Sequence, residues 1–163
     1  MNRTTTVTVR VEEPRWRNFG VDPVRIRAAA RLALVHGLEE KRVESKKYEV
    51  TILLASDERL RGLNAQFRSK DSPTNVLSFP SPASGGGYLG DVALALDFAA
   101  REAAAAGKRL SDHAVHLTVH GVLHLLGYDH LKAREAQRME GLETAVLHKL
   151  GVANPYRPAA EAE

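Results

Sequence analysis

The most informative absence in this sequence is cysteine, since none occurs among its 163 residues. Disulfide bonds and thiolate metal sites are therefore excluded, and a cytosolic protein is favoured. The N-terminal stretch MNRTTTVTVR lacks the continuous apolar core of a signal peptide. No later stretch approaches the roughly 20 apolar residues that span a bilayer. We therefore predict a soluble, cytoplasmic protein with no membrane partner.

The sequence also lacks a strong excess of either charge. Its 23 lysines and arginines and 20 aspartates and glutamates give a formal net charge of +3, which permits contact with nucleic acid without requiring it. No pattern of exposed aromatic residues typical of RNA-recognition modules is visible. Phe67, Phe79 and Tyr88 are interpreted as core or loop residues. Any RNA contact is expected to rest on basic side chains and phosphates, and to weaken with salt.

The spacing of apolar residues predicts alternating strands and helices. Alternation or short buried runs typical of strands cover 4–12, 48–54, 75–79 and 89–96. Helical spacing bounded by breaker residues covers 22–40, 57–68, 97–107, 112–126 and 133–150. This order favours an α/β or α+β fold, with one small mixed sheet of about four strands and about five helices packed on it. We expect a single domain over 1–163, with a partly disordered tail at 152–163.

Capping residues and apolar spacing indicate where the helices begin and which faces they bury. Asp22 is expected to cap the first helix, Ser56 or Asp57 the second, and Ser111 the helix over 112–126. The buried face of the first helix is expected to contain Val24, Ile26, Ala30, Leu34 and Leu38. That of the second is expected to contain Leu60, Leu63, Asn64 and Phe67.

Three of the seven histidines fall within one short stretch, HGVLHLLGYDH. His120 and His124 are four residues apart and lie on one helix face, where two imidazoles can bind one metal ion. Gly127 is expected to end this helix and turn the chain back, so that His130 approaches the same point. Three nitrogen ligands with a fourth position for water are typical of catalytic zinc sites. The stretch therefore predicts a hydrolytic site at the end of a central helix, with one zinc ion, or nickel or another divalent metal in its place.

The residue after the first histidine argues against one class of enzyme. Metzincin proteases share this histidine spacing but carry a glutamate base at that position, where this sequence has Gly121. His116 continues the stripe one turn earlier, but it lies about 12 Å along the axis from His124. It is too far away for His116, His120 and His124 to share one ion, and is a candidate for a substrate-side, ligand-orienting or packing role. His113 is expected to be structural or solvent-facing.

The histidine motif and three further segments resemble the YbeY family, the bacterial rRNA maturation factors described as metal-dependent endoribonucleases. The segments read LNAQFRSKDSPTNVLSFP, LGDVALAL and LGVANPY, and the resemblance covers residues 48–156. It implies a zinc-dependent endoribonuclease that cleaves single-stranded RNA, acting in 3′-end maturation of small-subunit rRNA and in ribosome quality control. It also implies that the ribosome or ribosomal proteins are partners.

Residue by residue, the resemblance implies that His120, His124 and His130 are metal ligands and that Arg68 lies beside the active cleft. A guanidinium meets two phosphate oxygens at once, so Arg68 is expected to act as a phosphate clamp. The family usually has aspartate where this sequence has Asn75. A carboxylate function would be weakened by that change, whereas a function in a turn would survive it.

Other residues are candidates for RNA binding and for proton transfer. Lys70, Arg59 and Arg61 are expected to contact RNA if the fold places them on one face. The general base is not identified: His116 and Asp129 are candidates, as is the 2′-hydroxyl of the RNA itself. Asp129 is alternatively expected to orient His130 through a hydrogen bond.

Two other functions remain open at this point. The first is a non-catalytic, ribosome-associated factor, whose metal is structural and whose basic surface binds rRNA. The second is a metal-dependent hydrolase of another substrate, peptides included, although Gly121 argues against a metzincin-type base.

Overall fold

The fold is described from a computed structural model for residues 4–41, 47–68, 74–81, 87–129 and 131–156, apart from the side chains of Lys41 and Arg68. Its centre is a four-stranded sheet in the order β1-β2-β4-β3. Strands β1, β2 and β4 are parallel, and β3 is an antiparallel edge strand beside β4. The strands span β1 (Thr4–Val11), β2 (Lys47–Ala55), β3 (Val76–Pro80) and β4 (Tyr88–Ala95). The mixed sheet predicted from the sequence is confirmed.

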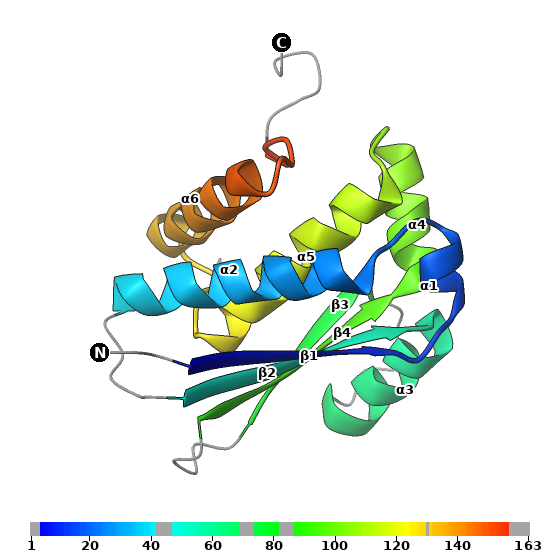
Figure 1. The fold of residues 1–163 in the computed structure, drawn as a ribbon, viewed down its shortest axis with the longest axis horizontal. Helices are drawn as coiled ribbons and strands as arrows, with labels where there is room; N and C mark the ends of the chain where they lie inside the picture. The colour runs from blue at the N-terminus through cyan, green and yellow to red at the C-terminus, as the bar shows by residue number, and fades with distance from the viewer. Residues whose placement is uncertain (1–3, 42–46, 69–73, 82–86, 130, 157–163) are drawn as a thin grey trace.

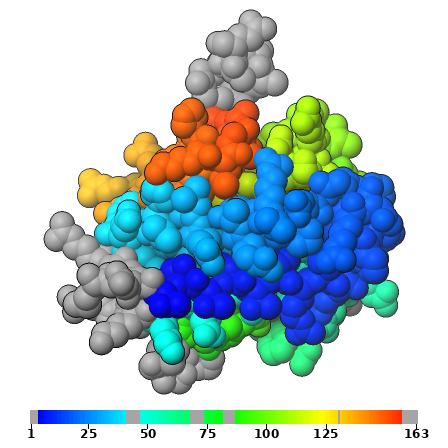
Figure 2. Space-filling model, in the orientation of Figure 1, coloured from blue at the N-terminus to red at the C-terminus, as the bar shows by residue number. Residues whose placement is uncertain are grey.

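The helices cover the two faces of this sheet unequally (Figure 1). Their bounds are α1 (Arg15–Asn18), α2 (Pro23–Lys41), α3 (Asp57–Arg68), α4 (Leu96–Ala105), α5 (Leu110–Leu125) and α6 (Ala133–Lys149). Helices α2 and α5 pack on one face, and α3 packs on the other against β3 and β4. Helix α6 packs on α2 and α5 as an outer layer, and Figure 2 shows it beside α2 on the molecular surface. The fold is therefore α/β, as predicted.

Strand alternation explains the two hydrophobic cores. In β2, Val50, Ile52 and Leu54 face α2 and α5, where they join the larger core. Leu53 and Ala55 point the other way and join the smaller core beneath α3. Because successive side chains of a strand point to opposite faces, one central strand supplies both cores. Among the helices of the described residues, none combines the length and apolar character needed to cross a membrane.

Most predicted helix faces are confirmed, with two errors. In α2, Ile26, Ala30, Leu34 and Leu38 are buried, but Val24 is 64% exposed. Val24 precedes Ile26 by two residues, which turns it about 200° around the helix and away from the core. In α3, Leu60, Leu63 and Asn64 are buried as predicted. Phe67 was also predicted to be buried, but it is 61% exposed.

Helix starts follow local chemistry in two of three predicted cases. The Asp22 carboxylate accepts a hydrogen bond from the Val24 amide, and the Ser56 hydroxyl accepts one from the Arg59 amide. The predicted cap at Ser111 is wrong, because α5 begins at Leu110 and no side chain caps it. The short helix α1 was not predicted. It is held by Trp16, which is fully buried and donates a hydrogen bond of 2.8 Å to the carbonyl of Ala55.

Candidate metal centre

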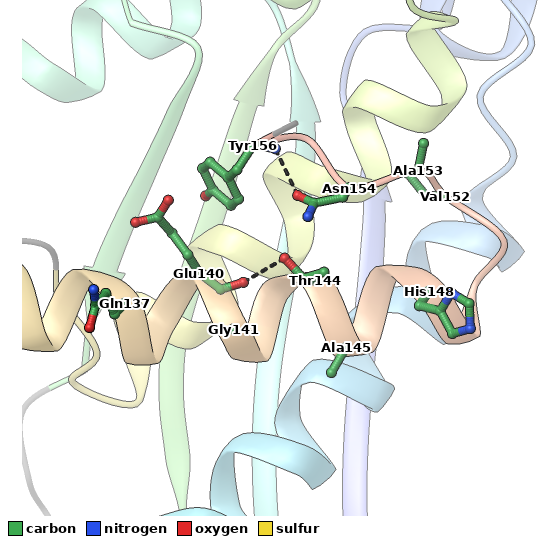
Figure 3. Close-up of a pocket in the computed structure, with 10 residues that line it drawn as sticks. All are labelled: Gln137, Glu140, Gly141, Thr144, Ala145, His148, Val152, Ala153, Asn154 and Tyr156. Atoms are coloured by element: carbon green, nitrogen blue, oxygen red, sulfur yellow. Dashed lines mark hydrogen bonds between the residues drawn. The ribbon is translucent and has the colours of Figure 1, made fainter. Parts of the chain in front are cut away.

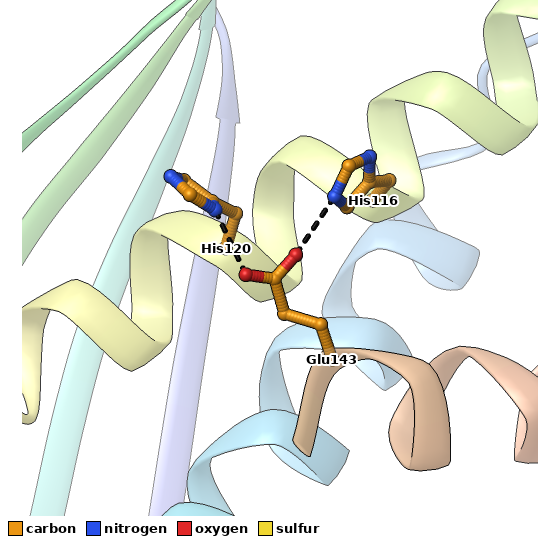
Figure 4. Close-up of side chains that lie close together, drawn as sticks. All are labelled: His116, His120 and Glu143. Atoms are coloured by element: carbon orange, nitrogen blue, oxygen red, sulfur yellow. Dashed lines mark hydrogen bonds and ion pairs between the residues drawn. The ribbon is translucent and has the colours of Figure 1, made fainter. Parts of the chain in front are cut away.

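Helix α5 carries a row of histidines beside helix α6. His116, His120 and His124 follow one another at four-residue spacing, the spacing that places side chains on one helix face. Residues on the opposite face, such as Ala114 and Val122, are fully buried in the larger core. Burial of that face fixes how the helix is rotated, and His116 and His120 point toward Glu143 of α6. Figure 4 shows His116 and His120 converging on Glu143 of α6.

His120 and His124 bring two ring nitrogens together as the sequence predicted. The Nε2 atoms of the two imidazoles are 3.0 Å apart. The other ring nitrogen of His120, Nδ1, lies 3.0 Å from Glu143 Oε1. A proton on Nδ1 donated to that carboxylate leaves the Nε2 lone pair of His120 facing His124. Neutral imidazole nitrogens at this separation suit a divalent ion such as zinc, nickel or copper.

Glu143 is the residue that sequence reasoning missed. Its side chain is fully buried, and it accepts hydrogen bonds from His116 Nε2 at 2.8 Å and from the Tyr156 hydroxyl at 2.6 Å. Burial raises the pKa of this carboxyl, but the hydrogen bonds from His116, His120 and Tyr156 outweigh burial and lower the pKa to about 2. The carboxylate is therefore ionised, and in these three contacts every partner donates a hydrogen bond to it.

A second grouping of the same side chains also has the chemistry of a metal site. Ligand atoms of His116, His120 and Glu143 all lie within 4.8 Å of one another, close enough to hold a divalent ion. In the structure both oxygens of Glu143 already accept hydrogen bonds. The Nε2 atoms of His120 and His124 face each other at 3.0 Å, whereas the carboxylate is placed as a group that orients an imidazole.

The end of α5 follows the predicted turn. Gly127 adopts a positive φ of 94°, and the amides of Gly127 and Tyr128 bond to the carbonyls of His124 and Leu123. This pair of bonds is a Schellman cap, which reverses the chain after a helix. The Tyr128 hydroxyl then donates to the carbonyl of Gly37 in α2 at 3.0 Å, which anchors the turn. Asp129 follows directly, and His130 lies outside the described residues, so its predicted place as third ligand stays a prediction.

Gly121 has a packing function that the sequence did not reveal. A Cβ built on it would lie 2.4 Å from Val92 Cγ1 and 3.3 Å from Ser78 Oγ. The Ser78 hydroxyl donates a hydrogen bond of 2.9 Å to the Gly121 carbonyl. Gly121 therefore lies where α5 closely approaches β3 and β4. A glutamate at this position would point into the sheet rather than toward the histidines.

The basic residues predicted to bind RNA are only partly placed. Arg59 is half-exposed, forms an ion pair of 3.3 Å with Glu12, and lines a groove of about 1160 Å³ between α3 and the sheet. Arg61 is exposed and is not among the residues that line the groove. Arg68 ends α3, but its side chain and all of Lys70 lie outside what the structure describes. A common face for Arg59, Arg61 and Lys70 therefore stays a prediction.

Three aromatic residues, which the sequence analysis interpreted as core or loop residues, line this groove. Phe67 and Tyr88 are exposed and line the groove with Phe79. The Phe67 and Phe79 rings meet edge to face, with their centroids 5.6 Å apart. Phe67 lies in the last turn of α3, and its side chain is 61% exposed. The groove thus combines aromatic faces with Arg59 and Arg10, but also contains Asp91.

Asn75 takes part in a polar cluster beside the histidine row. Its amide donates a hydrogen bond of 2.9 Å to Glu102 of α4, and His113 Nε2 lies 3.1 Å from the same carboxylate oxygen. An aspartate in place of Asn75 would lose this donor and oppose a second carboxylate. In this chain Asn75 therefore acts as a hydrogen-bond donor to Glu102. His113 is structural, one of the two roles expected for it.

The segment after α6 returns along that helix. It encloses a cleft of about 780 Å³, shown in Figure 3, which is lined by Glu140, Thr144 and His148 on one side and by Asn154 and Tyr156 on the other. The Asn154 side chain accepts a hydrogen bond of 2.8 Å from the Tyr156 amide and forms a local turn. This turn places the Tyr156 ring 5.8 Å from that of His116.

Comparison with known protein families gives a consistent result. The sequence model of the family described as endoribonuclease YbeY matches residues 14–151. Proteins named endoribonuclease YbeY from Ruegeria pomeroyi and Dinoroseobacter shibae are 41% and 43% identical to this chain. Each alignment covers 93% of this chain, and they cover 98% and 90% of those proteins. The protein of the same name from Paramagnetospirillum magneticum is 53% identical over 66% of this chain and 71% of its own length.

A solved structure supports the fold. The solution structure of TM1509 from Thermotoga maritima superposes with a TM-score of 0.57 at 18% identity. The match covers 93% of this chain and 99% of that protein. At this identity the likeness concerns the fold alone.

Proposed function

The chain belongs to the endoribonuclease YbeY family, and on that premise we propose that it is a metal-dependent endoribonuclease that cleaves single-stranded RNA. Its proposed role is rRNA processing in the cytoplasm, including 3′-end maturation of small-subunit rRNA and ribosome quality control. Ribosomes or ribosomal proteins are its proposed partners. The single observation that carries the proposal is the opposed pair of Nε2 atoms on His120 and His124, 3.0 Å apart, on a helix with an ionised carboxylate behind it.

We propose His120, His124 and His130 as the residues that hold the ion, and zinc as the ion. A zinc ion held there supplies Lewis acidity for cleavage of a phosphodiester bond. The donor set supports this assignment, because imidazole nitrogens suit zinc and the chain has no thiolate to offer. Glu143 holds the Nδ1 proton of His120, so that the nitrogen facing His124 keeps its lone pair.

Phosphate binding is assigned to arginines near α3. Arg68 remains the proposed clamp, because a guanidinium can donate to two phosphate oxygens at once. Arg59, Arg61 and Lys70 are proposed to bind the RNA backbone, and the exposed Phe67 and Tyr88 offer ring faces to unpaired bases. Ser78 connects this groove to the histidine row, since it lines the groove and bonds to Gly121, the neighbour of His120. His116 and Asp129 remain the proposed candidates for proton transfer.

The proposal is tested by cleavage of a defined single-stranded RNA with protein of measured metal content. Replacing His120 or His124 with alanine is expected to lower both the bound metal and the cleavage rate. The rate should fall by more than about 100-fold, since removing a group that only orients a ligand already costs about 10–100-fold. His148→Ala is the matched control, because that histidine is exposed at the end of α6 and is expected to leave cleavage unchanged.

Two results would contradict the proposal. Cleavage by His120→Ala at the wild-type rate, in a preparation shown to be free of contaminating nuclease, would exclude the metal-based mechanism. RNA or ribosome binding without turnover by the metal-loaded wild type would instead identify a non-catalytic ribosome-associated factor. A parallel screen of peptide substrates distinguishes a hydrolase of another class.

A further inference from the structure

We propose that Glu143 and Tyr156 are positioning residues, which together hold the His120 imidazole in the orientation and tautomer that bind the metal ion. This inference rests on the proposed function, because it assumes that His120 Nε2 is a ligand. It assigns a role to two residues that lie 23 and 36 positions beyond His120 in the chain. Glu143 comes from α6 and Tyr156 from the segment that follows it, so neither is part of the histidine motif.

The contact with Glu143 sets the tautomer of His120. A neutral imidazole carries one proton, and a metal ion can bind only the other nitrogen. Glu143 Oε1 lies 3.0 Å from Nδ1, which holds the proton there and leaves Nε2 for the ion. The same Nε2 lies 3.0 Å from His124 Nε2. Hydrogen bonding of a ligand histidine to a carboxylate fixes the ring and increases the basicity of the ligating nitrogen.

Glu143 is itself held in place by hydrogen bonds. An unpaired carboxylate is costly to bury, and the side chain of Glu143 is fully buried. Three donors compensate this cost: His120 on one oxygen, and His116 and Tyr156 on the other. Because both oxygens are engaged, the carboxylate cannot rotate away from Nδ1 without breaking several hydrogen bonds. The carboxylate is thus fixed from both sides.

Tyr156 connects the segment after α6 to Glu143. Its hydroxyl donates a hydrogen bond of 2.6 Å to Glu143 Oε2, and burial together with the nearby carboxylate raises the pKa of Tyr156 above its usual range. The tyrosine is therefore protonated and able to donate at neutral pH. Its approach along α6 is visible in Figure 3. Tyr156 therefore holds Glu143, and through Glu143 it acts on His120.

The test measures affinity for Co²⁺ or Zn²⁺ directly, by competition with a chromophoric chelator. Glu143→Gln keeps the shape of the side chain but removes its charge, and is expected to weaken metal binding by about 10–100-fold. Tyr156→Phe removes one hydroxyl, and is expected to weaken binding by about fivefold, the equivalent of one hydrogen bond. Glu140→Gln is the matched control, because it removes the same charge one turn earlier on α6 without a contact to His120 in the structure, and is expected to bind normally.

The absorption spectrum of bound Co²⁺ separates a positioning role from ligation. At saturating metal, Glu143→Gln is expected to give the wild-type spectrum, because the ligand atoms are unchanged. Loss or change of the cobalt bands at saturation would mean that Glu143 is itself a ligand, and would overturn the inference. Unchanged affinity in a folded Glu143→Gln protein would overturn it as well.

Failure of the inference is distinguishable from failure of the proposed function. A wild-type protein that binds no metal would contradict the proposed function, whatever the variants do. A wild-type protein that binds metal and cleaves RNA, with Glu143→Gln equal to it, would contradict only the positioning role. If Glu143→Gln does not fold, Tyr156→Phe decides, since wild-type affinity in that variant would exclude the arrangement proposed here.

Discussion

At the scale of single residues, Gly121 shows how a packing requirement can resemble a missing catalytic group. The sequence drew attention to it because proteases of this histidine spacing have a glutamate there. The structure shows that this position faces Val92 and Ser78 rather than the histidines. Valine is branched at Cβ and cannot easily move aside. The absence of a side chain at Gly121 therefore allows α5 to lie close to β4.

Gly121→Ala is expected to lower the free energy of unfolding by about 1–3 kcal/mol, because the new methyl group overpacks a filled contact. Gly62→Ala in α3 is the matched control. A Cβ there meets no atom within 4 Å, so the change should stabilise the helix by about 0.5–1 kcal/mol. Urea unfolding of both variants measures the difference. A Gly121→Ala protein as stable as the Gly62→Ala protein would show that α5 does not pack as described.

At the scale of elements, α5 is a helix whose polar side chains find their partners on other elements. His116 and His120 reach Glu143 on α6, and His113 reaches Glu102 on α4. The four-residue spacing of His120 and His124 and the stop at Gly127 could be predicted, because both depend on residues next to each other on one helix. Glu143 and Glu102 could not, because nothing in a single sequence indicates which carboxylate on another helix will face a histidine.

The contact between α5 and α4 predicts a pH dependence of stability. Burial lowers the pKa of His113, and Glu102 only partly offsets it, while His116 and Lys108 lower the pKa further. The folded protein thus binds a proton at His113 less readily than the unfolded chain does. Stability from this site is complete above the unfolded pKa of about 6.5 and is lost as the pH falls below it.

Urea unfolding at about pH 7.5 and about pH 5.5 measures this effect, which depends on the difference in protons bound. The wild type is expected to lose more unfolding free energy on acidification than His113→Gln, whose side chain does not titrate. The comparison isolates His113, because the other histidines are common to both proteins. Equal losses in the two proteins would show that His113 is not desolvated in the folded state.

At the scale of the whole molecule, local sequence patterns predicted which helices and strands form. They did not predict how the strands pair. The strands and most helices appear near the predicted positions, because periodicity is a property of short segments. The strand order β1-β2-β4-β3 was not predicted, since pairing joins segments distant in sequence. The exposure of Phe67 has the same origin, because only the neighbouring elements decide how much of its ring is covered. The exposure of Val24 follows instead from its angular position on α2.

A metal titration of RNA cleavage tests whether an ion held beside His120 and His124 makes this chain an endoribonuclease. Metal-free protein is loaded stepwise with zinc, and the initial rate on a defined single-stranded RNA is measured at each metal content. We expect a rate that rises from the chelator-treated baseline in proportion to bound zinc and stops rising at about one ion per chain. A rate that does not change with metal content, from metal-free to fully loaded protein, would contradict it.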